Sequence, residues 1–183
     1  ILFLAHRVPW PPDRGDKIRS FHILKKLQSL APVHVGAFAD DARDVECAEA
    51  ERAGLASLHV EIRDKPSWFS GIEALASGKP VSLTSFGSKA MQDWVNERLA
   101  SGAISHIFVF SGQMAQYVPA DFDGRFIMDF VDVDSAKFES YAGEGNSLMR
   151  WVHAREGKKL ADFEAEIAQR ADASLFVSEA EAT

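Results

Sequence analysis

The chain has 183 residues, of which 46% are apolar and 26% are charged, a balance typical of a globular domain with a sizeable core. Its net charge of -7 and pI of about 5.3 argue against a dedicated nucleic-acid binder, whose surface is usually basic, so no nucleic-acid partner is expected. The single cysteine, Cys47, excludes an intrachain disulfide and a cysteine metal cluster, and we interpret it as structural.

Apolar runs of strand length alternate with stretches of helical periodicity. In chain order they predict a strand at Ile1–Ala5, a helix at Lys17–Leu30, a strand at Val33–Phe38, a helix at Ala42–Ala53, a strand at Leu58–Ile62, helices at Pro66–Ala76 and Ser88–Ser101, a strand at Ile104–Phe110, a helical turn at Gly112–Tyr117, a strand at Phe126–Phe130, a helix at Asn146–Arg170 and a strand at Ser174–Val177. Asp16 is the expected N-cap of the first helix, and Gly157 is a candidate kink in the last.

Most of the predicted strands are continuous apolar runs, which is typical of strands that are buried on both faces of a parallel sheet. Strands that alternate with helices indicate an α/β fold with right-handed crossovers. We therefore expect one Rossmann-like domain over residues 1–183, with a mostly parallel sheet flanked by helices.

No run approaches the roughly 20 apolar residues that cross a bilayer, and the opening run is too short and lacks the charged leader of a secretory signal. We expect a cytoplasmic protein. The sequence begins without methionine and ends in a polar stretch, Ser178–Thr183, so we also expect that it is part of a longer chain.

Ligands of open α/β sheets bind beyond the carboxyl ends of the strands, which directs attention to the loop His6–Lys17. Gly15 would allow close backbone approach, and the helix N-terminus behind it offers amide groups to an anion or a polar sugar. Arg14, Lys17 and Arg19 add positive charge. The loop lacks the dinucleotide and P-loop patterns, and an equally good interpretation is a rigid loop that only shapes the helix.

Two further strand ends carry candidate polar groups. Ser111, Gly112 and Gln113 follow the fourth strand and would form an anion-binding corner, although Ser111 as a simple N-cap is at least as good an interpretation. Asp129, Asp132 and Asp134 alternate along the exit of the fifth strand, where they would hold sugar hydroxyls.

Other roles are possible for the three carboxylates and for one tryptophan of the first loop. Three carboxylates without a fourth patterned ligand are a weak metal signal, and Asp134 is more simply a helix N-cap. Asp129 lies within an apolar strand and therefore needs a buried partner. Trp10, in the first loop, is a minority candidate for a sugar-stacking platform.

Several stretches in this order resemble retaining glycosyltransferases of the GT-B fold, and especially the sugar transferases of PEP-CTERM/exosortase-type exopolysaccharide clusters. The stretches are Leu2–Pro9, Pro11–Arg19, Phe108–Ser111, Ala115–Val118, Met128–Ser135, Phe163–Glu164 and Arg170–Glu179. They span nearly the whole chain, and their order and strand-end placement carry the resemblance more than any single motif.

The resemblance implies that this chain is the N-terminal, acceptor-side half of a two-domain enzyme, and that the nucleotide-sugar domain follows Thr183. It implies transfer of a sugar from a nucleotide-sugar to an acceptor hydroxyl, of a polysaccharide or a lipid-linked sugar, with retention and without metal or another cofactor. A lipid-linked acceptor would bring the enzyme to the inner face of the membrane as a peripheral protein. The chain alone would then be inactive.

The resemblance also assigns site residues. Asp16 and Asp129 become the candidate catalytic residues, and the candidate donor- or acceptor-binding residues are His6, Arg14, Gly15, Lys17, Arg19, Ser111, Gly112, Gln113 and Asp132. Many relatives carry a histidine after the fourth strand, where this chain has Ser111–Gln113, which leaves the donor preference open. Two alternatives remain at this point, namely a GT-B nucleotide-sugar epimerase domain and a non-catalytic Rossmann-like binding module.

Overall fold

The computed structural model describes residues 1–64, 73–74, 77–131 and 147–178. Its elements, in chain order, are β1 (Leu2–Ala5), α1 (Gly15–Gln28), β2 (His34–Ala39), α2 (Ala42–Ala50), η1 (Arg52–Gly54), β3 (Ser57–Ile62), α4 (Val81–Ser85), α5 (Lys89–Ala100), β4 (His106–Phe110), η2 (Gly112–Tyr117), β5 (Arg125–Asp129), α7 (Ser147–Arg170) and β6 (Ala173–Leu175). The predicted helix at 66–76 falls largely outside the described residues.

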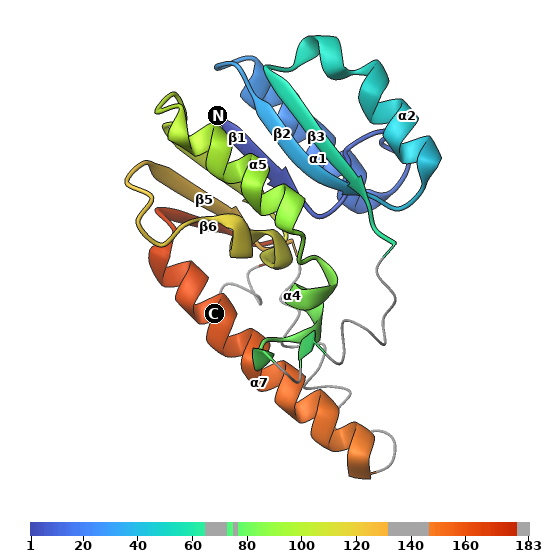
Figure 1. The fold of residues 1–183 in the computed structure, drawn as a ribbon, viewed down its shortest axis with the longest axis vertical. Coiled ribbons are helices and arrows are strands. Elements are labelled where there is room, and N and C mark those ends of the chain that lie inside the picture. Colours follow the sequence, from blue (N-terminus) through green and yellow to red (C-terminus); the bar gives the residue numbers. More distant parts are fainter. Residues whose placement is uncertain (65–72, 75–76, 132–146, 179–183) are drawn as a thin grey trace.

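The six strands form one sheet in the order β3-β2-β1-β4-β5-β6, and every neighbouring pair is parallel. The predicted Rossmann-like α/β fold is confirmed, because this is the strand order of doubly wound nucleotide-binding sheets. The chain moves outward from β1 through β2 to β3, and then outward in the other direction from β4 through β5 to β6 (Figure 1). The order therefore reverses between β1 and β4.

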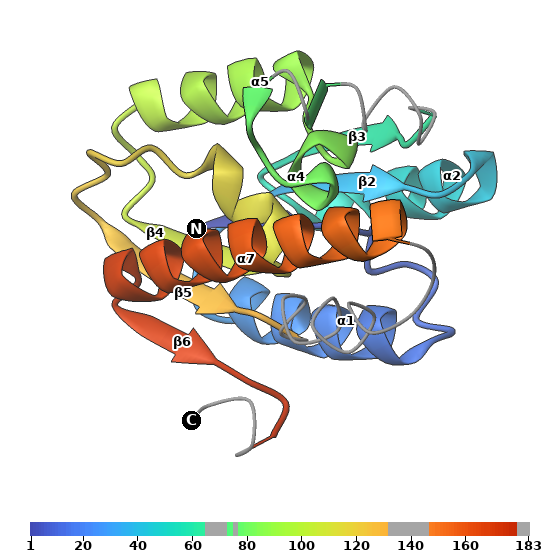
Figure 2. The same cartoon turned by 90° about the horizontal axis from the view of Figure 1, so that it is seen from below.

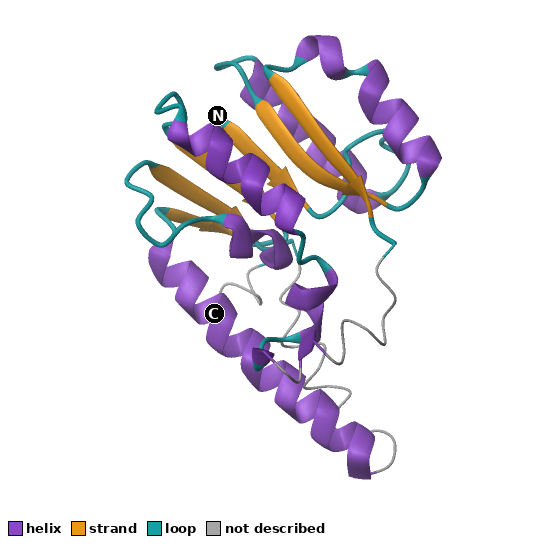
Figure 3. Ribbon diagram, viewed as in Figure 1, coloured by secondary structure: helices purple, strands orange, loops and turns teal. Residues whose placement is uncertain are grey.

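Hydrophobic cores lie on both faces of the sheet, as the continuous apolar strands predict. On one face Phe3 of β1 packs with Leu24 of α1 and Ala48 of α2. On the other face Leu4 of β1 packs in a cluster with Met91 of α5, together with residues of η2 and α7. Figure 2 shows the strands between α1 and α5, which lie at opposite sides of the sheet, and Figure 3 distinguishes the helices from the strands.

Local sequence explains the close fit of α5. Ser88 caps the helix by accepting a hydrogen bond from the Met91 amide. A Cβ atom at Gly36, in β2, would lie 2.8 Å from the Trp94 ring, so glycine is required where α5 approaches the sheet. Trp94 is thus a packing residue.

The structure corrects three local predictions. Helix α1 begins at Gly15 with Arg14 as its N-cap residue, so Asp16 lies in the first turn and is not the cap. Only 3% of Trp10 is exposed, because it packs in the hydrophobic core with Leu24 of α1. It therefore cannot serve as an exposed platform for a sugar. Helix α7 runs without interruption through Gly157 to Arg170.

Candidate functional site

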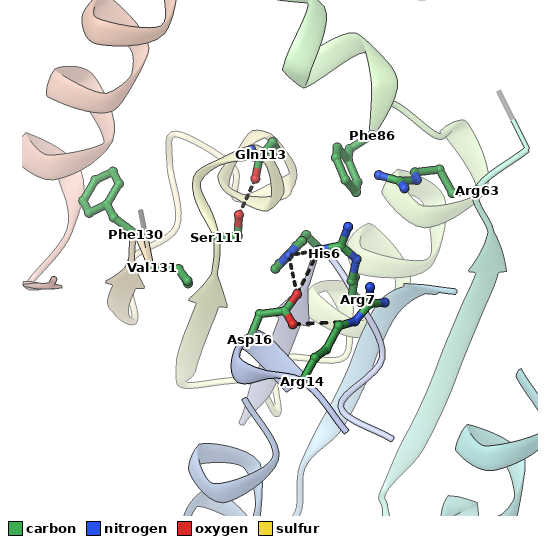
Figure 4. Close-up of a pocket in the computed structure, with 10 residues that line it drawn as sticks. All are labelled: His6, Arg7, Arg14, Asp16, Arg63, Phe86, Ser111, Gln113, Phe130 and Val131. Atoms are coloured by element: carbon green, nitrogen blue, oxygen red, sulfur yellow. Dashed lines mark hydrogen bonds and ion pairs between the residues drawn. The ribbon is translucent and has the colours of Figure 1, made fainter. Parts of the chain in front are cut away.

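A pocket of about 410 Å³ opens at the carboxyl edge of the sheet, at the point where the strand order reverses (Figure 4). It is lined by His6, Arg7, Arg14, Asp16, Arg63, Phe86, Ser111, Gln113, Phe130 and Val131. Nearly all of these residues follow a strand or open a helix. This is the place where open α/β sheets bind their ligands.

His6 forms the floor of the pocket, directly after β1. Only 9% of the residue is exposed, and its ring stacks on Phe110 with centroids 5.9 Å apart. The Nε2 atom lies 3.4 Å from Asp16 Oδ2 and 3.3 Å from Arg7 Nη1. The Nδ1 atom is buried and has no hydrogen-bond partner among the described residues. The ring is therefore fixed by stacking and by its bond to Asp16.

Asp16, in the first turn of α1, contacts both His6 and Arg7. Its Oδ2 accepts a hydrogen bond of 2.8 Å from Arg7, and its Oδ1 accepts one of 2.9 Å from the Lys17 amide. The hydrogen bonds from His6 and Arg7 hold the pKa of Asp16 well below its ordinary value, although burial acts in the opposite direction. Asp16 is consequently an anion at neutral pH and positions His6 and Arg7.

This lowered pKa predicts an acid-dependent contribution to stability. Because the pKa of Asp16 is lower in the folded than in the unfolded chain, its carboxylate stabilises the fold above the unfolded pKa of ~3.9, and the contribution is lost as the pH falls below that value. Urea unfolding of wild type and Asp16→Asn between pH 7 and pH 2 should show a stability difference that is full at neutral pH and shrinks in acid. A difference that stays constant over this range would contradict the assignment.

Three arginines converge on a second carboxylate, Asp40, which follows β2. Arg7 donates to Asp40 Oδ2 over 3.0 Å, Arg63 donates to Oδ1 over 3.1 Å, and Arg14 donates to Oδ2. Burial raises the pKa of Asp40, but the arginine bonds and charges outweigh it and bring the pKa below its ordinary value. Arg63 also lies over the Phe86 ring, with its guanidinium carbon 5.0 Å from the centroid. We call Arg7, Arg14, Arg63 and Asp40 the arginine cluster.

The opposite wall of the pocket contains two strained backbone positions. Ser111 has φ 82° and Val131 has φ 65°, although neither is glycine. A positive φ at the β-branched Val131 is unusual and costs on the order of 1–3 kcal/mol. Both residues line the pocket, Ser111 directly after β4 and Val131 two residues after the end of β5. The Ser111 hydroxyl donates a hydrogen bond to the Gln113 side chain. Strain of this kind concentrates at ligand sites.

Glycines at two helix starts beside the pocket have open space around them. A Cβ atom added at Gly15 or at Gly112 would meet no atom within 4 Å, and neither residue has a positive φ. The fold itself therefore requires glycine at neither position. Both positions stay candidates for close approach of a ligand to the backbone.

Lys17, which was predicted to bind ligand, lies away from the pocket. Lys17 is only 2% exposed, and its Nζ atom forms a 2.6 Å ion pair with Asp44 of α2 and a bond to the Trp10 carbonyl. This pair ties α1 to α2 beneath the loop. Lys17 does not line the pocket. The prediction that it binds donor or acceptor is corrected to a structural role.

Asp129, predicted to be catalytic, is completely buried at the end of β5. Arg19 of α1 clamps its carboxylate through contacts of 2.9–3.1 Å, and Asp129 Oδ1 accepts a bond from the Val131 amide. The expected partner of the buried carboxylate is thus Arg19. Neither residue lines the pocket, and Asp129, held by Arg19, anchors the strained Val131 turn. Asp132 and Asp134 lie outside the described residues.

The site therefore unites five predicted residues, which are His6, Arg14, Asp16, Ser111 and Gln113. Sequence reasoning missed Arg7, Arg63, Asp40 and Phe86. Arg63 and Asp40 each follow a predicted strand within one or two residues, so an inspection of every strand end would have found them. Phe86 carries no such signal. It is positioned by Tyr117, whose hydroxyl donates to its carbonyl.

Within the described ranges, no group of three or more His, Cys, Asp or Glu side chains is placed to hold a metal ion. In the same ranges no helix is long and apolar enough to span a bilayer. Comparisons with protein-family models, with curated proteins and with solved structures found no match for this chain.

Proposed function

We propose that this chain is the N-terminal, acceptor-side domain of a retaining GT-B glycosyltransferase. The full-length enzyme would move a sugar from a nucleotide-sugar to a hydroxyl of a polysaccharide or lipid-linked acceptor. The observation that carries the proposal is the polar pocket between β1 and β4, where the strand order reverses. Helix α1 begins beside this pocket at Gly15, which has free space around it. The sequence resemblance supplies the sugar chemistry.

Each pocket residue has a role in this proposal. Gly15 lets the substrate approach the N-terminus of α1, where the helix dipole favours negative charge. The arginines of the cluster stabilise charge that develops on the departing diphosphate or is carried by the acceptor. Ser111 and Gln113 offer a hydroxyl and an amide to sugar hydroxyl groups. Asp16 keeps His6 and Arg7 in place beneath the reacting groups.

The continuation of the gene past Thr183 tests whether this domain is half of an enzyme. We expect a second α/β domain with paired glutamates. A stop codon directly after Thr183 would contradict the proposal and favour a non-catalytic binding module.

An incubation without acceptor separates the transferase from an epimerase. The full-length protein is given a nucleotide-sugar alone, and the sugar products are resolved by chromatography. We expect no isomerisation of the sugar. Accumulation of an epimer without any glycoside, in this incubation and in one with acceptor, would assign the protein to the epimerases.

A further inference from the structure

The pocket has a cationic end and a neutral end. The guanidinium groups of Arg7, Arg14 and Arg63 come from the ends of β1 and β3 and from the start of α1, and they form one side. Ser111 and Gln113, after β4, form the other side with an uncharged hydroxyl and an amide. A ligand that fills both ends would therefore carry an anionic group next to a neutral, hydroxyl-rich group.

The arrangement of the cluster keeps the positive charge toward the pocket. All three arginines line the pocket, whereas Asp40, on which they converge, does not. The pocket is therefore lined by the guanidinium groups and not by the Asp40 carboxylate. Each guanidinium has five N–H donors, and among the described residues the only hydrogen bond of the Arg63 guanidinium runs from Nη2 to Asp40.

The charge balance also favours an anion. Among the described residues, the three arginines pair with two carboxylates, Asp16 and Asp40, which leaves these five side chains with a net charge of +1 in a chain whose total is -7. The side chains of Arg7, Arg14 and Arg63 are 28%, 45% and 33% exposed, so a ligand can reach them. Planar guanidinium groups bind phosphate oxygens in a bidentate manner.

We propose that the arginine cluster binds a phosphate or diphosphate group carried by the sugar acceptor, with Asp40 as the internal anion that competes with it. The proposal rests on the proposed function, since it takes this domain to be the acceptor side of a glycosyltransferase. The sugar of the acceptor would extend from the cationic end toward Ser111 and Gln113, so that the pocket recognises a phosphorylated or lipid-diphosphate-linked sugar.

Titration of the chain with inorganic pyrophosphate, followed by calorimetry, tests the anion site without any need for catalysis. Arg63→Gln should weaken binding by about tenfold or more, because it removes a charge-assisted contact. Arg14→Gln should do the same, and it provides a second variant if the first unfolds. Arg52→Gln is the matched control, since Arg52 also pairs with a carboxylate, Glu49, but does not line the pocket. Equal affinities in all four proteins would overturn the proposal.

Asp40→Asn is expected to have the opposite effect on pyrophosphate affinity. The amide keeps the shape of the carboxylate but removes the competing charge, so pyrophosphate should bind about tenfold more tightly than to wild type. Thermal unfolding with and without pyrophosphate shows whether the variant is folded and whether the anion stabilises it. Unchanged or weaker binding by a folded Asp40→Asn protein would contradict the role of Asp40.

Two probes distinguish the source of the phosphate. Farnesyl diphosphate represents a lipid-linked diphosphate and UDP represents the donor. We expect farnesyl diphosphate to bind at least as tightly as pyrophosphate and to lose affinity in Arg63→Gln, and UDP to bind no more tightly than pyrophosphate. UDP binding that is tenfold tighter than pyrophosphate would assign the cluster to the donor and overturn the acceptor assignment.

Two results distinguish a failure of the anion-site proposal from a failure of the proposed glycosyltransferase function. Pyrophosphate binding that depends on Arg63, in a full-length protein that transfers no sugar, would leave the anion site in place and contradict the glycosyltransferase. Sugar transfer with unchanged KM for the acceptor in Arg63→Gln would contradict the anion site and leave the glycosyltransferase in place.

Discussion

Lys17→Ala is expected to lower the free energy of unfolding by about 3–5 kcal/mol, because it leaves the buried carboxylate of Asp44 without its cation. The Lys17 ammonium is 2.6 Å from Asp44 Oδ1, and both side chains are at least nine-tenths buried. The same ammonium contacts the carbonyl of Trp10, so its loss also frees the loop that leads to the pocket. Chemical denaturation measures the change.

The double variant Lys17→Met, Asp44→Leu is the control for this effect. Both charges are then replaced by apolar groups, so that no unpaired charge stays buried, and we expect most of the lost stability to return. A loss below about 1 kcal/mol in Lys17→Ala would show that the pair behaves as a solvent-exposed ion pair and would contradict its structural role.

Gly15→Val is expected to reduce turnover of the full-length enzyme by on the order of a hundredfold or more, with little change in melting temperature. A Cβ atom at position 15 meets nothing within 4 Å, so the fold has room for the side chain. The added methyl groups would stand where we expect the substrate to approach the start of α1, and a displacement of about 1 Å at a reacting centre is enough for such a loss.

Gly15→Ala provides the graded comparison. Alanine adds one methyl group and favours the helix more than glycine does, so the protein should be slightly more stable, by about 0.5–1 kcal/mol, while turnover falls less than in Gly15→Val. Full turnover in a folded Gly15→Val protein would show that nothing binds against this backbone.

The sheet could be predicted from the sequence because strands that are buried on both faces need apolar residues at successive positions. The continuous apolar runs at β1, β2 and β4 show this pattern directly. The strand boundaries differ from the predictions by one or two residues. The predicted start of α1 was wrong because Asp16 satisfies Arg7 and His6 instead of capping the helix, and this choice depends on residues brought close by the fold.

The charged residues show where sequence reasoning stops. Lys17 and Arg19 are two positions apart on one helix, and both looked like ligand-binding cations. The structure turns Lys17 toward Asp44 and Arg19 toward Asp129, partners that lie 27 and 110 residues away in the chain. Nothing local in the sequence encodes these pairs. Strand-end position, by contrast, is readable from the sequence, and it correctly placed His6, Arg14 and Ser111 at the same pocket.

The most direct test of the central claim is the product formed by the full-length protein from a nucleotide-sugar that is offered, in parallel incubations, with a phosphorylated and an unphosphorylated sugar acceptor. Mass spectrometry detects the glycoside, and NMR of its anomeric proton gives the configuration. We predict a new glycoside with the anomeric configuration of the donor, formed equally well after chelation of divalent metal. No glycoside across the common nucleotide-sugars, or a glycoside of inverted configuration, would contradict the assignment of this domain to a retaining glycosyltransferase.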